Sequence, residues 1–141
     1  MTKTVRETQA MLAGMKPRLA SGEFVFCTSR DVDLIARANP LALGSFKEDE
    51  GTTLILARAD AKALGFDEAM PMRRIVLDVF SALDGIGLTA GVASALTAAK
   101  IPCNMIAAYH HDHVFVPAHR AEEAVAVLNE VAAGAVTDRQ R

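Results

Sequence analysis

Residues 75–131 read IVLDVFSALDGIGLTAGVASALTAAKIPCNMIAAYHHDHVFVPAHRAEEAVAVLNEV. The apolar, β-branched segment 74–80 predicts a strand. Ala, Leu and Val recur at helical spacing over 88–100 and 119–133, and two short strands are predicted between these helices. This order of elements predicts the core of a βαββαβ half-sandwich, an α+β unit whose helices cover an antiparallel sheet.

The N-terminal half of the chain predicts related elements. Residues 41–47 and 53–58 flank the turn 48–51, a plausible hairpin with a glycine available for positive φ. The segment 23–28 is apolar on both faces, which predicts a central strand covered on both sides or a strand at a module interface. Helical segments are predicted at residues 4–14, 31–38 and 60–64.

Pro71 marks the predicted boundary between two modules, residues 1–70 and 71–141. The N-terminal module holds three strand candidates, a hairpin and a short helix, so we interpret it as a degenerate copy of the C-terminal one. No repeat is visible in the residues themselves, and the duplication is inferred from element order alone.

The composition excludes several functional classes. A formal net charge of −2, no Trp and one Tyr among 141 residues leave little with which to bind nucleic acid. No apolar stretch approaches the roughly 20 residues that span a bilayer, and residues 1–7 lack a signal peptide's apolar core. We therefore expect a cytoplasmic protein without a membrane partner. Cys27 and Cys103 are expected to be buried thiols.

The loop Asp84-Gly85-Ile86-Gly87-Leu88-Thr89 follows a predicted strand and opens a predicted helix, with Thr89 as a possible cap. Its glycines free backbone N–H groups at a helix N-terminus, where partial positive charge favours a carboxylate. The alternative is that they only allow a tight turn. A dinucleotide fingerprint is disfavoured because Ala90 stands where its third glycine would be, and no cofactor is predicted.

Two further positions are candidate ligand contacts. The Asn104 amide can donate to a carboxylate and accept from an ammonium group, although it could instead satisfy local backbone. Glu50 is the best placed of three acidic residues before Gly51 to recognise an amine. A solvated hairpin turn is the alternative for that acidic group.

The segment His111-Asp112-His113 suggests a metal site as an alternative. On an extended strand the two histidines share one face, and two imidazoles with a carboxylate could begin a zinc or iron site. The other interpretation is that these side chains hold the hairpin by local hydrogen bonds. Neither cysteine is near a histidine in sequence and no Gly-x-Ser-x-Gly elbow occurs, so an enzyme is not predicted.

Several strings, taken in order, resemble the ACT-like family of small cytoplasmic proteins with two fused ACT-type modules. They are Met15–Leu19, Glu23–Thr28, Phe46–Leu54, Gly87–Ala90 and Tyr109–Pro117. The resemblance implies tandem ferredoxin-like modules without catalysis of their own, and capture of an effector, often an amino acid, at module interfaces. It also places the effector pocket at Leu83–Thr89 and Pro102–Ile106.

These observations lead to a sensor hypothesis with two rivals. In the sensor, the backbone of 85–88 holds a carboxylate and Asn104 bridges polar groups. The expected side-chain pocket consists of Ile86, Leu88, Met105 and Ile106. Pairing as a homodimer would remove exposed sheet edges. The rivals are a metal-dependent enzyme or sensor built on 111–113, and a ligand-free structural module.

Overall fold

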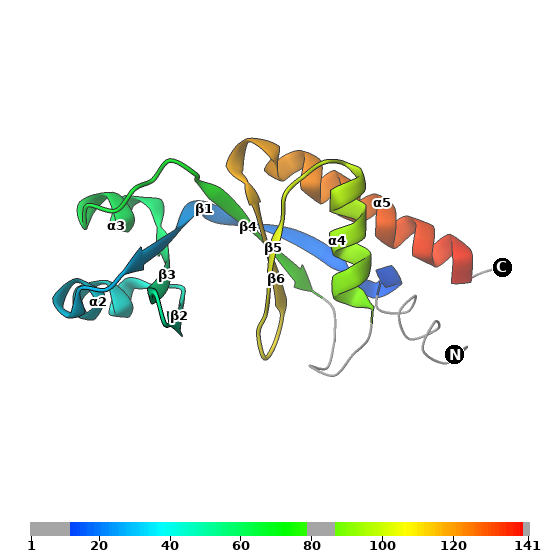
Figure 1. Ribbon diagram of the computed structural model, residues 1–141. Coiled ribbons are helices and arrows are strands. Elements are labelled where there is room, and N and C mark those ends of the chain that lie inside the picture. The colour runs from blue at the N-terminus through cyan, green and yellow to red at the C-terminus, as the bar shows by residue number, and fades with distance from the viewer. Residues whose placement is uncertain (1–11, 79–86, 140–141) are drawn as a thin grey trace. The chain divides into compact units, whose positions relative to one another are not determined.

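The computed structural model describes residues 12–78 and 87–139 (Figure 1). Its described residues form two compact units, of which one contains those up to Ala20 and from Arg74 onward, and the other contains Ser21–Arg73. Strand β1 (Lys16–Ser29) contributes its first residues to one unit and its last residues to the other. Most of the predicted helix 4–14 lies outside the described residues, and 12–14 are helical.

The unit Ser21–Arg73 is a three-stranded antiparallel sheet with two helices. The strand order is β2-β3-β1, with Phe26 opposite Ile55 and Phe46 opposite Thr53. This pairing confirms the predicted hairpin, and helices α2 and α3 confirm the helical segments predicted at 31–38 and 60–64. The elements after β1 are α2 (Val32–Ala38), η1 (Asn39–Leu41), β2 (Gly44–Glu48), β3 (Gly51–Ala57) and α3 (Arg58–Ala63).

The core of this unit lies on one face of its sheet. Its buried members are Val25, Cys27, Ala38, Leu54, Leu56 and Ala61. Along β1, Val25 is 2% exposed, whereas the next residue, Phe26, points to the opposite face and is 39% exposed. Here the strand therefore has one buried and one exposed face, so the first predicted alternative, a strand covered on both sides, is not observed.

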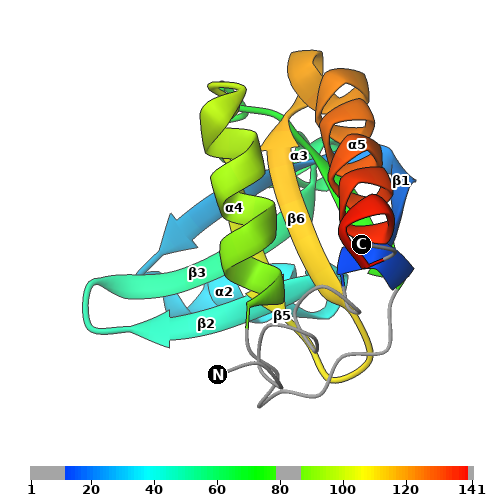
Figure 2. The same cartoon turned by 90° about the vertical axis from the view of Figure 1, so that its right-hand side faces the viewer.

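The second unit combines the start of β1 with the C-terminal half of the chain. Its strand order is β1-β4-β6-β5, and helices α4 and α5 lie over one face of the sheet (Figure 2). Met105 lies opposite Val114, and Ile106 opposite His113. The elements are β4 (Met72–Asp78), α4 (Leu88–Ala98), β5 (Asn104–Ala107), β6 (Asp112–Pro117), η2 (Ala118–Arg120) and α5 (Ala121–Arg139).

Apolar side chains from both helices and the sheet form the second core. The helical spacing predicted over 119–133 is confirmed, because Ala121, Ala124 and Leu128 are at most 2% exposed and Val125 and Val131 pack against the same core. The other buried members are Met15, Ile75, Leu77, Leu88, Val92, Leu96, Ile101, Val114 and Val116. None of the helices in the described ranges is long and apolar enough to cross a membrane.

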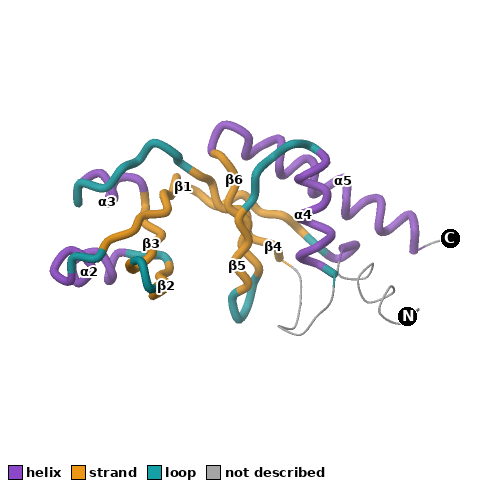
Figure 3. The backbone as a smooth tube through the Cα atoms, viewed as in Figure 1, coloured by secondary structure: helices purple, strands orange, loops and turns teal. Residues whose placement is uncertain are grey.

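The same order of elements occurs twice along the chain (Figure 3). It runs β1-α2-β2-β3-α3 and then β4-α4-β5-β6-α5, and in both copies the third strand lies between the first and the second. This duplicated topology agrees with tandem ferredoxin-like, α+β modules. The predicted modules, 1–70 and 71–141, follow chain order, whereas the compact units do not, because described residues up to Ala20 group with the C-terminal half.

Candidate functional site

The start of α4 is the described part of the predicted ligand loop. Asp84, Gly85 and Ile86 lie outside the described residues. Gly87 occupies the helix N-cap with φ +98°, a left-handed conformation that favours glycine, and no described side chain caps the first N–H groups. Thr89 is therefore an exposed first-turn residue and not the cap. The N–H groups at this helix start are suited to an anionic partner.

The remaining predicted residues of this unit divide between two faces. Leu88 is 3% exposed and belongs to the core beneath the helices, against which Met105 also packs. Alternation along β5 places Asn104 and Ile106 on the opposite face, where Asn104 is exposed and Ile106 half-buried. Leu88 and Met105 thus contribute to the core. Of the predicted ligand contacts, the polar Asn104 and the apolar Ile106 lie on the other face of the sheet.

Glu50 lies in the exposed turn between β2 and β3, in the other compact unit. Its neighbour Glu48 accepts a hydrogen bond from the Thr53 hydroxyl across the hairpin. Exposure of Glu48, Asp49 and Glu50 matches the solvated-turn interpretation of this acidic group.

Asp78, at the end of β4, forms a small polar cluster with Arg18 of β1 and with His111, which directly precedes β6. Its Oδ2 accepts from Arg18 Nε at 3.0 Å, and its Oδ1 lies 3.4 Å from His111 Nε2. The hydrogen bond from Arg18 holds the pKa of the Asp78 carboxyl below its usual value. His111 is therefore oriented toward Asp78.

The His111 and His113 rings lie near each other, with centroids 6.5 Å apart and planes at 68°. Burial lowers the pKa of His113, and the charges of Arg74 and His111 act in the same direction. Burial raises the pKa of Asp112. Across residues 12–78 and 87–139, no three His, Cys, Asp or Glu residues are placed to hold one metal ion. The described residues therefore do not supply a set of ligands for a metal at 111–113.

Cys27 and Cys103 are free thiols, the first buried and the second partly buried. Burial raises the pKa of both, and the charge of Asp67 raises that of Cys27 further. A raised pKa keeps a thiol protonated and makes it a poor nucleophile at neutral pH. Both residues therefore have the properties of packing residues.

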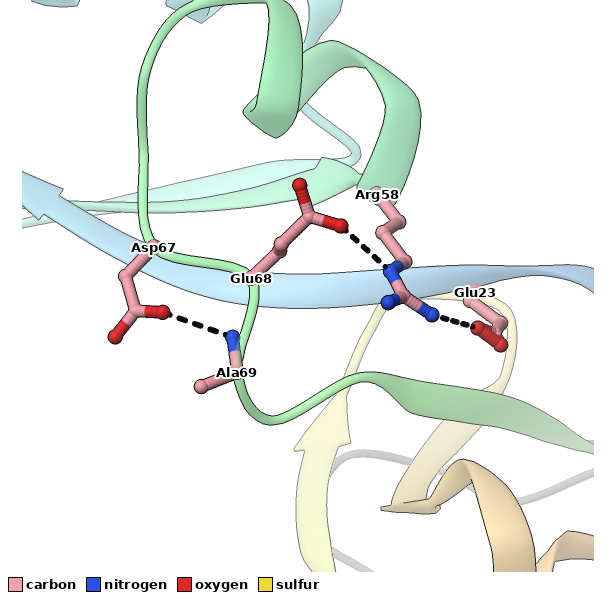
Figure 4. A network of polar contacts seen from close by, with 5 residues as sticks. All are labelled: Glu23, Arg58, Asp67, Glu68 and Ala69. Carbon is pink, nitrogen blue, oxygen red and sulfur yellow. Dashed lines mark hydrogen bonds and ion pairs between the residues drawn. The ribbon is translucent and has the colours of Figure 1, made fainter.

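The unit Ser21–Arg73 also contains a polar network that the sequence did not predict (Figure 4). Arg58 donates to Glu23 Oε1 over 2.8 Å and to Glu68 Oε1 over 3.0 Å. Asp67 Oδ1 accepts from the Ala69 N–H at 2.9 Å. A pocket of about 170 Å³ is lined by Val25, Phe26, Asp67, Ala69, Met70 and Met72.

Both halves of the chain match a known family. Residues 3–73 and residues 73–130 each match the ACT domain. A Vibrio cholerae protein of unknown function, described as a possible transport protein, is 33% identical with a TM-score of 0.80, over 92% of this chain and 98% of that one. A search of curated proteins found no match.

Two further solved structures share the fold at low sequence identity. An Agrobacterium tumefaciens protein is 16% identical with a TM-score of 0.68, over 84% of this chain and 89% of that one. The regulatory subunit of aspartate kinase from Thermus thermophilus is 10% identical with a TM-score of 0.60, over 82% of this chain and 96% of that one. At these identities the likeness establishes the fold alone.

Proposed function

The chain belongs to the ACT domain family, and from this we propose that it is a regulatory protein whose effector is an amino acid or a similar small carboxylate. The tandem ACT match over residues 3–73 and 73–130 carries the proposal, and the duplicated order of elements supports it. The Thermus thermophilus neighbour is itself described as a regulatory subunit. We propose binding rather than catalysis, with no cofactor, in the cytoplasm.

We place the effector carboxylate at the turn that leads into α4. The left-handed Gly87 and the uncapped helix start support this, because α4 has 11 residues and no acidic side chain in its first turn. Asn104 and Ile106, on the sheet face opposite the helices, are kept as proposed effector contacts at a module interface. Glu50 is proposed to bind an ammonium group at the equivalent interface of the other module. The proposed site also includes six residues from the loop, the start of α4 and strand β5. They are Asp84, Gly85, Ile86, Leu88, Thr89 and Met105.

We also propose that the protein works as a homodimer. Strand β2 is an edge strand of the sheet in one unit, and β5 is an edge strand in the other. Pairing of such edges between two chains would satisfy backbone groups that otherwise face water. A ligand held at the resulting interface would regulate a partner only if it binds one arrangement more tightly than another.

Thermal denaturation with each amino acid at millimolar concentration tests the proposal. A ligand that binds only the folded protein stabilises it by about 2.7 kcal/mol at one hundred times its Kd. We expect one chemical class of amino acid to raise Tm and the others to leave it unchanged. Elemental analysis of unchelated protein runs in parallel. A bound metal would favour the metal alternative. No change in Tm with any amino acid, together with no bound metal, would favour a ligand-free interaction module.

Two variants locate the effector. Gly87→Val puts a β-branched residue at φ +98° and should abolish the ligand-dependent rise in Tm. Asn104→Ala removes the amide without straining the backbone and should weaken binding about tenfold. Gly65→Ala, at φ +84° with no atom within 4 Å, is the matched control for strain at a positive φ. Full affinity in both Gly87→Val and Asn104→Ala would place the pocket elsewhere.

A further inference from the structure

The pocket beside the loop that follows α3 is open to solvent, and its lining is mostly apolar. Phe26, Met70 and Met72 line it together with Val25 and Ala69. Its volume of about 170 Å³ is similar to the roughly 150 Å³ of an enclosed engineered cavity that binds benzene, although this pocket is open on one side. The space therefore suits a ligand body of one six-membered ring or a branched aliphatic chain.

Two of the apolar lining residues are more exposed than apolar side chains usually are. Phe26 is 39% exposed and Met70 is 72% exposed. Covering such surface with an apolar ligand is favourable, because it removes apolar area from water. A thioether and an aromatic ring are also adaptable, polarisable contacts for a small apolar body. A ligand in this pocket would bury surface that is otherwise in contact with water.

The pocket has one charged lining residue, Asp67. The Ala69 N–H holds one of its carboxylate oxygens at 2.9 Å, which fixes the side chain at the start of the lining loop. The neighbouring carboxylates, Glu23 and Glu68, are both paired with Arg58. In Figure 4 Asp67 points away from that pair, on the other side of its loop.

Asp67 itself has no cationic partner among the described residues. Its exposed negative charge beside the apolar lining of the open pocket therefore favours a ligand that carries a positive charge. A protonated amine would complete the hydrogen bonding of the carboxylate.

We propose that this pocket binds a small primary amine with a compact apolar body, held by Asp67 at its ammonium group and by Phe26, Met70 and Met72 around its body. The site is separate from the effector site proposed above, because its ligand needs no carboxylate and its residues belong to the unit Ser21–Arg73. The two proposals can therefore fail independently.

Benzylamine is the probe, with benzyl alcohol and benzoate as ligands of similar size and different charge. Binding is followed by chemical shifts of the Ala69 amide and the Met70 and Met72 methyl groups. We expect benzylamine to bind with a Kd of about 1 mM or tighter, and benzyl alcohol about tenfold more weakly. Benzoate should shift none of these signals. Equal affinity for all three probes, or no binding, would overturn the proposal.

Two variants assign the contacts. Asp67→Asn should remove the preference for amine over alcohol while keeping weak binding of both. Ala69→Leu fills the pocket from an exposed position and should abolish binding of both without unfolding the protein. Asp49→Asn, at an exposed turn residue outside the lining, is the control and should bind benzylamine as the original chain does. An amine preference that survives in Asp67→Asn would refute the assignment of Asp67.

Discussion

Gly51 begins β3 so close to the end of β1 that a Cβ on it would lie 3.0 Å from the carbonyl oxygen of Ser29. The same atom would lie 3.0 Å from Thr28 Oγ1. Gly51 also has φ +153°, at the edge of the region that L side chains avoid. Two independent constraints, close approach and backbone conformation, therefore require glycine at the turn of this hairpin.

We predict that Gly51→Ala destabilises the protein by about 1–3 kcal/mol. The added methyl group must push against backbone, which cannot move without disturbing the pairing of Ser29 with Thr52. Urea denaturation measures the effect. Gly44→Ala is the control, because a Cβ there would meet Ile55 Cδ1 at an ordinary 3.8 Å. Equal stability of the two variants would show that the turn relaxes without cost.

Glycines inside helices provide a second comparison. Gly134 lies in α5, is exposed, and a Cβ there would meet nothing within 4 Å. Gly134→Ala should therefore stabilise the protein by about 0.5–1 kcal/mol, the usual difference between the two residues in a helix interior. In α4, a Cβ on Gly91 would lie 3.0 Å from Leu12 Cδ2. Gly91→Ala should gain less, because Leu12 has to move. The same urea assay ranks the two, and the reverse order would contradict the prediction.

Local patterns were sufficient to predict most of the helices and strands. The hairpin around 48–51 carried a turn signal between two strand-like runs, and the last helix carried its apolar residues at helical spacing. The compact units do not follow the order of the chain, because a continuous 14-residue strand contributes to both of them. Linear boundaries cannot describe a strand shared in this way.

The candidate site was less predictable than the fold. Alternation in a short strand depends on its register, and this register puts Asn104 and Met105 on opposite faces of the sheet, which the sequence alone does not specify. The Arg58 network joins residues 35 and 10 positions apart in the chain. Such pairings follow from tertiary structure and have no local spacing to reveal them. The pocket beside Asp67 depends on the same long-range placement.

The acid sensitivity of the protein should depend on His113. Burial holds its pKa below the ordinary value of 6.5, so the unfolded chain takes up a proton at a higher pH than the folded chain does. Above that value both states are neutral and His113 has no effect on stability. As pH falls through 6.5 toward the folded-state pKa, protonation favours unfolding and stability is lost.

His113→Asn removes this titration while keeping a polar side chain of similar size. We expect its Tm to fall less than that of the original chain between pH 7 and pH 5, by about 2 °C or more. Thermal scans at half-unit intervals of pH measure the difference. Parallel pH profiles for His113→Asn and the original chain would contradict the prediction.

The two thiols should differ in reactivity for a physical reason that involves Asp67. Burial raises the pKa of both, but the carboxylate of Asp67 adds to this effect at Cys27. Asp67→Asn should therefore lower the midpoint of the pH–rate profile for alkylation of Cys27 and leave that of Cys103 in place. Mass spectrometry of each cysteine-containing peptide provides the two profiles from one sample, with Cys103 as the internal control. Saturating benzylamine should shift Cys27 in the same direction, because an ammonium group beside Asp67 offsets its charge. A Cys27 midpoint that stays unchanged in Asp67→Asn would show that this carboxylate and thiol do not interact in solution.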